Sequence, residues 1–293
     1  MTPWPIRSLL GLVLTLAANL CACAAVPGKD PTAGPEEPPA VGPHINAPFQ
    51  APDFGQWLGS FEHTGREVFD ERFRIVAALG LQPGATVADI GAGTGLFTLL
   101  FARAVGPTGR VYAVEIAQTF LAGILERTKD YHVTNVVGVL GTRDDTGLEE
   151  ASIDLAFVCD TYHHFEYPKA MLASIARALR PGGELVVIDY RRTPGLSSPW
   201  VQGHVRAGQE QVTEEIVAAG FVPLGEETFL RDNWFLRFRK ADVEPSDPPR
   251  AQEQGQDSSR PPGTTVQKRC NNLILLSARR LLDVLPKHKF ITN

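Results

Sequence analysis

Cysteine is scarce in this sequence, with four residues scattered along 293. Cysteines this few and this scattered exclude a fold held together mainly by disulfides. Positive charge is also in short supply, because 28 Lys and Arg are outnumbered by 33 Asp and Glu, and the formal net charge is −5. Domains that bind nucleic acid are usually clearly basic. The sequence therefore predicts no nucleic-acid partner.

Charge is missing altogether between Arg7 and Lys29. The apolar run at 8–18 has the length of a signal-peptide core, about 7–15 residues. Leu20 lies three residues before Cys23, which resembles a bacterial lipoprotein signal, and residues 22–24 also fit the small-x-small rule of ordinary signal peptidase. Residues 1–25 are thus predicted to be a signal peptide or a lipoprotein signal. An uncleaved membrane anchor and a chance apolar start are the alternatives.

The signal predicts an exported protein, periplasmic or membrane-anchored, and a lipid at Cys23 would allow membrane association. If the segment is not a functional signal, the protein is cytoplasmic. Prolines gather in two other tracts, with eight of the 23 between 26 and 52 and five between 241 and 265. Proline lacks an amide donor and favours extended chain. Residues 26–52 are accordingly predicted to be a disordered tether, and 241–293 a disordered tail. Residues 272–285 have the pattern of a short basic amphipathic helix, unless this end contributes nothing.

Between 53 and 240 apolar strands alternate with helices. Strands are expected at 86–90, 110–116, 135–140, 153–159 and 184–189, with helices at 96–105, 117–129, 168–179 and 205–220. Segments 221–229 and 233–240 should close the domain as a hairpin. Continuous apolar strands that alternate with helices favour a parallel sheet buried on both faces. The predicted fold is α/β: one doubly wound, Rossmann-like domain with a mostly parallel seven-stranded sheet, helices on both faces and an antiparallel C-terminal hairpin.

A glycine loop follows the first of these strands, with Gly91, Gly93 and Gly95 leading into a helix. The nicotinamide fingerprint is G-x-G-x-x-G, and here the third glycine comes one residue early. Asp89, two residues before the loop, is unfavourable for a diphosphate but suits a cation. Glu115 ends the next strand, where this fold places an acid on ribose hydroxyls. These residues indicate a positively charged adenosine ligand without phosphates, and they disfavour a nicotinamide cofactor.

Residues 89–95, Glu115 and residues 179–185 together resemble the motifs of class I S-adenosylmethionine-dependent methyltransferases. The resemblance covers about residues 60–240. It implies S-adenosyl-L-methionine as cofactor, with its methionine part over the glycine loop near Asp89 and its ribose on Glu115. The acid that reaches the adenine amine would be Asp144 or Asp145, and the choice stays open because this segment departs from the commoner Gly-Asp-Ala form.

The same resemblance places catalytic groups after the fourth strand, in residues 159–165, a segment that resembles its counterpart in the small-molecule and quinone-type methyltransferases. Asp160 would lie near the reacting centre, Tyr162 could orient the substrate, and His163 or His164 could act as general base, since the imidazole pKa is near ~6.5. The alternative is that one histidine packs on the following helix and the other caps a loop.

Two further segments could close the site. Residues 61–66 precede the first strand, where the family often carries a helical lid. His204 and Arg206 follow the fifth strand and would suit an anionic group of a small-molecule substrate. No metal site is predicted, because the adjacent His163 and His164 cannot chelate as an i, i+4 pair does.

The sequence thus predicts methyl transfer from S-adenosylmethionine to an unidentified small molecule. The predicted signal at residues 1–25 indicates export, however, whereas this cofactor is made in the cytoplasm. That conflict motivates the alternative of an exported, non-catalytic protein that binds an adenosine ligand and retains the fold.

Overall fold

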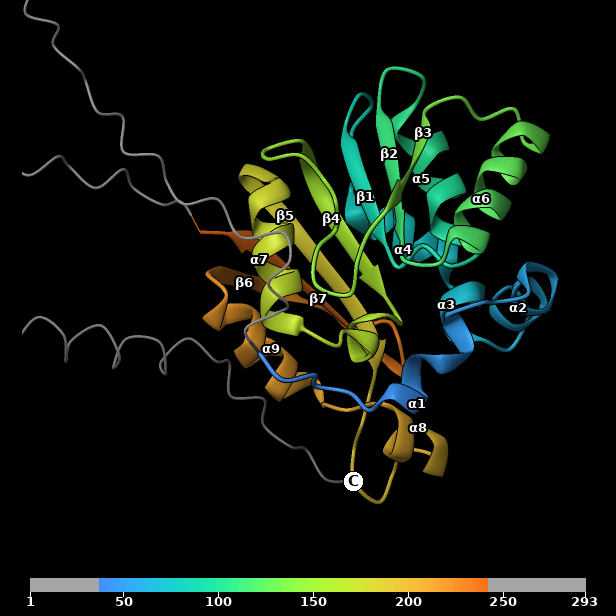
Figure 1. Cartoon of the computed structure of the whole chain (residues 1–293). Coiled ribbons are helices and arrows are strands. Elements are labelled where there is room, and N and C mark those ends of the chain that lie inside the picture. Colours follow the sequence, from blue (N-terminus) through green and yellow to red (C-terminus); the bar gives the residue numbers. More distant parts are fainter. Residues whose placement is uncertain (1–36, 242–293) are drawn as a thin grey trace, which may run out of the picture. The chain divides into compact units, whose positions relative to one another are not determined.

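Seven strands form one sheet in the order β3-β2-β1-β4-β5-β7-β6 in the computed structural model, which describes residues 37–241 (Figure 1). The strands are β1 (Thr86–Ile90), β2 (Arg110–Glu115), β3 (Val136–Leu140), β4 (Ile153–Cys159), β5 (Leu179–Tyr190), β6 (Phe221–Glu227) and β7 (Asn233–Lys240). Strands β1 to β5 pair in parallel, and β7 pairs antiparallel with both β5 and β6. This topology confirms the predicted fold. The predicted signal segment and nearly all of the predicted tail lie outside the described residues.

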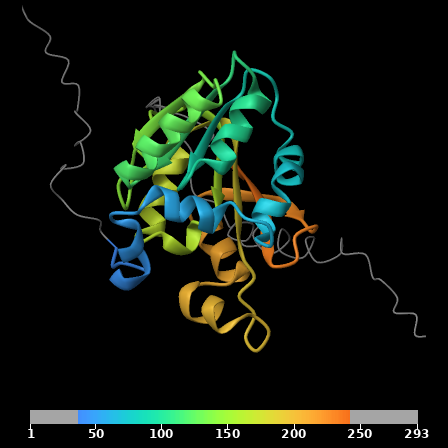
Figure 2. The same cartoon turned by 90° about the vertical axis from the view of Figure 1, so that its right-hand side faces the viewer.

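The helices connect and cover these strands (Figures 1 and 2). They are α1 (Pro43–Asn46), α2 (Phe54–Phe61), α3 (Glu67–Asp70), α4 (Arg72–Leu79), α5 (Leu96–Val105), α6 (Gln118–Asp130), α7 (Pro168–Ala178), α8 (Pro199–His204) and α9 (Gln209–Ala218), with the short 3-10 helices η1 (Ala47–Phe49) and η2 (Tyr162–His164). Among residues 37–241, every helix is too short or too polar to span a membrane.

Two apolar clusters hold the layers together, one on each face of the sheet. In β1, Val87 packs with α4 and α5, whereas its neighbour Ala88 faces α7 and α9. Successive strand residues point to opposite faces, so continuous apolar strands supply both clusters. Burial of this apolar surface is the main force that stabilises the fold.

Three segments differ from the sequence-based expectation. The predicted tether contains α1 and η1, so its second half is not extended chain. Pro43 and Pro48 occupy the first turn of these helices, where the missing amide donor costs nothing. The helix expected at 205–220 forms as α9 only, after the separate short helix α8, and β5 begins five residues earlier than expected.

Candidate cofactor and substrate site

A cavity of about 1230 Å³ opens at the carboxyl ends of the central strands. Ile90 of β1 lies between Val114 of β2 and Val158 of β4 in the sheet register. The segments that follow these three strands therefore meet at one edge. The strand order reverses between β1 and β4, which is the position where open α/β sheets bind ligands.

The glycine loop forms part of the cavity wall. Gly91 has φ 71° and Gly93 has φ 56°, a left-handed backbone that disfavours other residues. A Cβ added at Gly91 would lie 2.2 Å from the side chain of Thr161, and one at Gly93 would lie 3.3 Å from Phe61. Only glycine at these two positions lets the loop pass this close to its neighbours. Because these residues have no side chains, the loop presents its main chain to a ligand.

Glu115 links the loop to the end of β2. Its Oε2 accepts a hydrogen bond from Gly93 N–H at 3.0 Å, and its Oε1 accepts from Ile116 and Ala117 N–H at 2.8 and 3.2 Å. Burial raises the pKa of Glu115, and these three donors act in the opposite direction. The carboxylate lines the cavity and is held in one orientation before any ligand arrives.

Asp89 is the second buried acid of the cavity, with 4% of its surface exposed. Thr98 Oγ1 donates a hydrogen bond to its Oδ2 at 2.6 Å. Burial raises the pKa of Asp89 from its ordinary 3.8 to about 7, against the effect of the Thr98 hydrogen bond. A cation in the cavity would offset the cost of ionising this carboxyl.

The loop after β3 brings Asp145 to the cavity. Its carboxylate also pairs with Arg177 at 2.9 Å and accepts a hydrogen bond from Gly147 N–H. Asp144 belongs to the same loop and accepts a hydrogen bond from Thr142 Oγ1 at 2.8 Å. The predicted adenine contact of Asp144 or Asp145 stays a prediction, with Asp145 the one at the cavity wall.

Asp160 also lines the cavity, in a polar network whose other members were not predicted from the sequence. Arg66 donates to its Oδ2 at 2.6 Å and Asn233 Nδ2 to its Oδ1 at 2.7 Å, and both partners line the cavity. Asp160 has φ 47°, a conformation uncommon outside glycine that concentrates at functional sites. Arg66 belongs to the predicted lid, and the polar Asn233 at the start of an apolar strand was the signal for the other partner.

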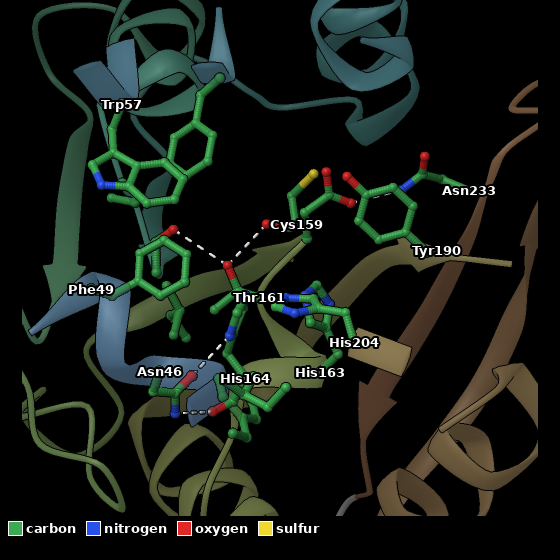
Figure 3. A pocket seen from close by; sticks show the side chains of 18 of the residues that line it. Asn46, Phe49, Trp57, Cys159, Thr161, His163, His164, Tyr190, His204 and Asn233 are labelled. Atoms are coloured by element: carbon green, nitrogen blue, oxygen red, sulfur yellow. Dashed lines mark hydrogen bonds between the residues drawn. The ribbon is translucent and has the colours of Figure 1, made fainter. Parts of the chain in front are cut away.

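The two adjacent histidines have different partners, and Figure 3 shows Asn46 beside His164. His163 Nδ1 lies 2.7 Å from Asp189 Oδ1, and its backbone N–H donates to Asp189 Oδ2 at 3.0 Å. Burial opposes protonation of His163, but Asp189 raises its pKa. His164 Nδ1 lies 2.8 Å from Asn46 Oδ1, and burial lowers the pKa of His164 to about 2. Its imidazole is therefore neutral at physiological pH.

His204 joins these histidines from α8. Its ring stacks on Trp200 at 4.6 Å between centroids, and it lies edge-on to His163 and His164 at 5.2 and 5.1 Å. All three line the cavity. The sequence predicted each residue separately and did not place them together. Asp189 and Asn46, which orient two of the rings, were missed because they come from distant parts of the chain.

Tyr162 and Arg206 do not reach the cavity, contrary to their predicted contact with substrate. Tyr162 is fully buried, and its hydroxyl donates to Glu215 Oε2 at 2.9 Å. Arg206 spends its guanidinium on both oxygens of Glu215, at 2.8 and 2.7 Å. A bidentate pair of this kind uses both terminal nitrogens of the guanidinium. Arg206 therefore binds Glu215 of α9 instead of the substrate anion that it was expected to hold.

Replacing Tyr162 by phenylalanine should therefore lower stability without affecting turnover. Loss of a buried hydrogen bond to a carboxylate costs about 1–2 kcal/mol. Urea unfolding of the full chain would show the loss, and turnover should stay within about twofold of wild type because the hydroxyl is remote from the cavity. A large fall in turnover with unchanged stability would restore the substrate role.

The segment before β1 covers the cavity with aromatic rings. Trp57 lies between Phe49 and Phe61, with centroids at 4.7 and 4.9 Å, and all three line the cavity (Figure 3). Glu62 accepts hydrogen bonds from Thr94 of the glycine loop and from Arg127. The lid predicted at residues 61–66 thus belongs to a longer cover that begins at α1.

Residues 88–187 match the family model described as methyltransferase domain. The chain carries a class I methyltransferase domain. The matched residues include the last three residues of β1, the glycine loop, Glu115 and the segment after β4, which form part of the cavity wall described above. S-adenosylmethionine is the cofactor of this family.

Relatives of the methyltransferase domain support the assignment. The chain is 33% identical over 157 residues to an uncharacterized 37.1 kDa protein in a transposon of Streptomyces fradiae, covering 50% of this chain and 42% of the relative. It is 31% identical over 123 residues to the ubiquinone/menaquinone biosynthesis C-methyltransferase UbiE of Shewanella pealeana, covering 42% and 49%. The chain therefore spans less than half the length of these curated relatives.

A solved S-adenosylmethionine-dependent methyltransferase from Aquifex aeolicus shares the fold, with a TM-score of 0.57 and 20% identity over 64% of this chain and 99% of the solved one. The residues of the methyltransferase domain fit the cofactor. The glycine loop leaves main chain where a Cβ would intrude, Glu115 is a carboxylate held in one orientation that could accept from hydroxyls, and Asp89 is a buried acid that a cation would complement.

Proposed function

We propose that this domain transfers the methyl group of S-adenosylmethionine to a small-molecule acceptor that enters the same cavity. The observation that carries the proposal is the pair of buried acids at the ends of β1 and β2. Asp89 and Glu115 line one cavity with the histidines of η2 and α8. The cofactor supplies an electrophilic methyl group, and the chain must align the acceptor with it and exclude water.

The two acids and the glycine loop would bind the cofactor. Glu115 would accept hydrogen bonds from the ribose hydroxyls, because its carboxylate is already oriented by Gly93 and its neighbours. Asp89 would complement the positive charge of the methionine part. The cover from α1 to α2 would shield the reacting centre with Phe49, Trp57 and Phe61.

The acceptor is proposed to be an aromatic or otherwise flat apolar molecule. Aromatic rings of the cover and of Trp200 in α8 line the cavity. Its volume of about 1230 Å³ exceeds the roughly 300–1,000 Å³ of common ligand pockets, which leaves room for cofactor and acceptor together. The similarity to a quinone-biosynthesis C-methyltransferase supports the same class.

The test is transfer of a labelled methyl group. The full chain, incubated with methyl-labelled S-adenosylmethionine and a panel of phenols, quinols and thiols, should form S-adenosylhomocysteine with at least one acceptor. Cofactor binding with no transfer to any acceptor would favour the non-catalytic binding protein instead.

Alanine at His163 or His164 should slow this turnover by about 100-fold or more, the scale of lost acid–base or positioning groups. Cofactor affinity should stay within about twofold, since neither ring belongs to the glycine loop or β2 side of the cavity. His132, an exposed residue with φ 54°, offers the control His132→Asn, which should change neither quantity. Unchanged turnover in both His163→Ala and His164→Ala would contradict the expected role.

A further inference from the structure

Three histidines from two separate segments converge in the cavity. His163 and His164 belong to η2, and His204 ends α8, forty residues further along the chain. One ring nitrogen of each lies within 4.8 Å of those of the other two. We propose that His163, His164 and His204 bind a divalent transition-metal ion of the Zn²⁺ type.

The hydrogen bonds at Nδ1 leave Nε2 of two rings as the ligand atom. Asn46 Nδ2 donates to His164 O and to Glu166 Oε1, at 3.0 and 3.1 Å. Its Oδ1 must therefore face His164, and only a protonated Nδ1 can donate to it. The lone pair of His164 is consequently on Nε2.

His163 is fixed in the same way by a carboxylate. Its Nδ1 faces Asp189 Oδ1 at 2.7 Å, and its backbone donates to the other oxygen of Asp189. A metal-binding histidine almost always donates its second ring N–H to a carboxylate or carbonyl oxygen, which orients the ring and strengthens it as a ligand. Two of the three histidines have such a partner, and Asp189 also supplies negative charge beside the ion.

The spacing allows a tetrahedral ion after a small closure. Zn–N bonds of about 2.0–2.1 Å separate two ligand nitrogens by about 3.3 Å, so a pair at the 4.8 Å limit must approach by about 1.5 Å. His204 can make this movement, because its side chain is half-buried on a helix of six residues. His163 and His164 are each held at Nδ1, by Asp189 and Asn46 respectively.

Three neutral nitrogens with an open fourth position are the pattern of catalytic rather than structural zinc sites. Imidazole ligands suit Zn²⁺ and its neighbours Cu²⁺, Ni²⁺ and Fe²⁺ and disfavour Mg²⁺. The ion's role rests on the proposed function: at the open position it would hold an acceptor oxygen or sulfur and favour its deprotonated form. Binding of the ion does not rest on that function.

The test is a metal titration of the full chain, free of any affinity tag and stripped with EDTA. Co²⁺ should bind with one equivalent per chain and give the visible absorption of a low-symmetry nitrogen site, and Zn²⁺ should displace it. His164→Ala and His204→Ala should each weaken Co²⁺ binding by at least 100-fold. Asp189→Asn should weaken it about 10–100-fold, as loss of a ligand-orienting carboxylate does. His132→Asn should bind as wild type does.

Melting temperatures show whether a variant fails to bind the metal because it has lost the site or because it is unfolded. Zn²⁺ should raise the melting temperature of wild type but not of His204→Ala, whose metal-free melting temperature should match wild type. Equal Co²⁺ binding by wild type and His204→Ala, or no stoichiometric binding by wild type, would overturn the proposal. A cofactor titration in EDTA tests the proposed function independently, because neither Asp89 nor Glu115 is a ligand of the ion.

Discussion

We expect the replacement of Glu115 by alanine to weaken S-adenosylmethionine binding by about 100-fold or more. Hydrogen bonds to a charged group contribute about 1.5–3 kcal/mol each, and the side chain would make them to two ribose hydroxyls. The same change removes the acceptor of three backbone N–H groups, of Gly93, Ile116 and Ala117, so the glycine loop loses one of its links to β2. Calorimetric titration of the full chain would measure the loss.

Glu115→Gln separates the two effects. Its single carbonyl oxygen can accept from Ile116 and Ala117, but its amide group opposes the N–H of Gly93. Affinity should therefore fall in this variant as well, by less than in Glu115→Ala, while the melting temperature changes little. Wild-type affinity in Glu115→Ala would show that the acid has no part in the cofactor site.

Affinity for the cofactor should rise with pH through the titration of Asp89. The pKa of this buried carboxyl is about 7 in the ligand-free protein, and a cationic ligand favours its ionised form. Below that value the carboxyl must lose a proton before the ligand gains the interaction, so affinity should fall by up to about tenfold for each pH unit. Titrations on both sides of pH 7 would show the slope.

Asp89→Asn is the control for this slope. The amide can still accept the hydrogen bond of Thr98, but it does not titrate, so affinity should be low and independent of pH across the same interval. The pKa of Asp89 is higher in the folded protein than the ordinary 3.8. The free energy of unfolding should therefore fall as the pH rises from 3.8 to about 7, and it should stay at the lower value above pH 7. Above that range the ligand-free Asn variant should be more stable by about 1–4 kcal/mol, on the scale of 1.36 kcal/mol per pKa unit. An unchanged slope in Asp89→Asn would assign the titration to another group.

The order of strands and helices could be predicted because two local signals agreed. Strands such as residues 153–159 are apolar without interruption, which a sheet covered on both faces requires, and glycines mark the turn after β1. Asp89 and Glu115 were predictable for a related reason. Each has a fixed place relative to a strand end, so chain position alone brings it to the sheet edge.

Proline density misled the prediction of the tether. Pro43 and Pro48 lie at helix starts, where proline is favourable, and Asn46 between them binds His164. Composition records how many prolines a segment holds but not which turn of a helix each occupies.

Side chains that depend on a distant partner were the least predictable. Arg206 looked available for substrate, yet Glu215 on the next helix pairs with both of its terminal nitrogens. His204 gave no metal signal, because its distance from His163 along the chain matches no chelating motif and only the packing of α8 brings it close. The sequence places Asp189 at the end of a strand but does not indicate that its carboxylate contacts His163. Export also stays a prediction, since residues 1–25 lie outside the described part of the chain.

The buried acids at the ends of β1 and β2 are expected to form the cofactor site, and one calorimetric titration tests this most directly. S-adenosylmethionine is added to the metal-free full chain above pH 7, and S-adenosylhomocysteine is added in parallel. One molecule of cofactor should bind per chain, with the affinity reduced in both Glu115→Ala and Asp89→Asn. No binding of either ligand at millimolar concentration, in a chain whose melting curve shows it to be folded, would contradict the account.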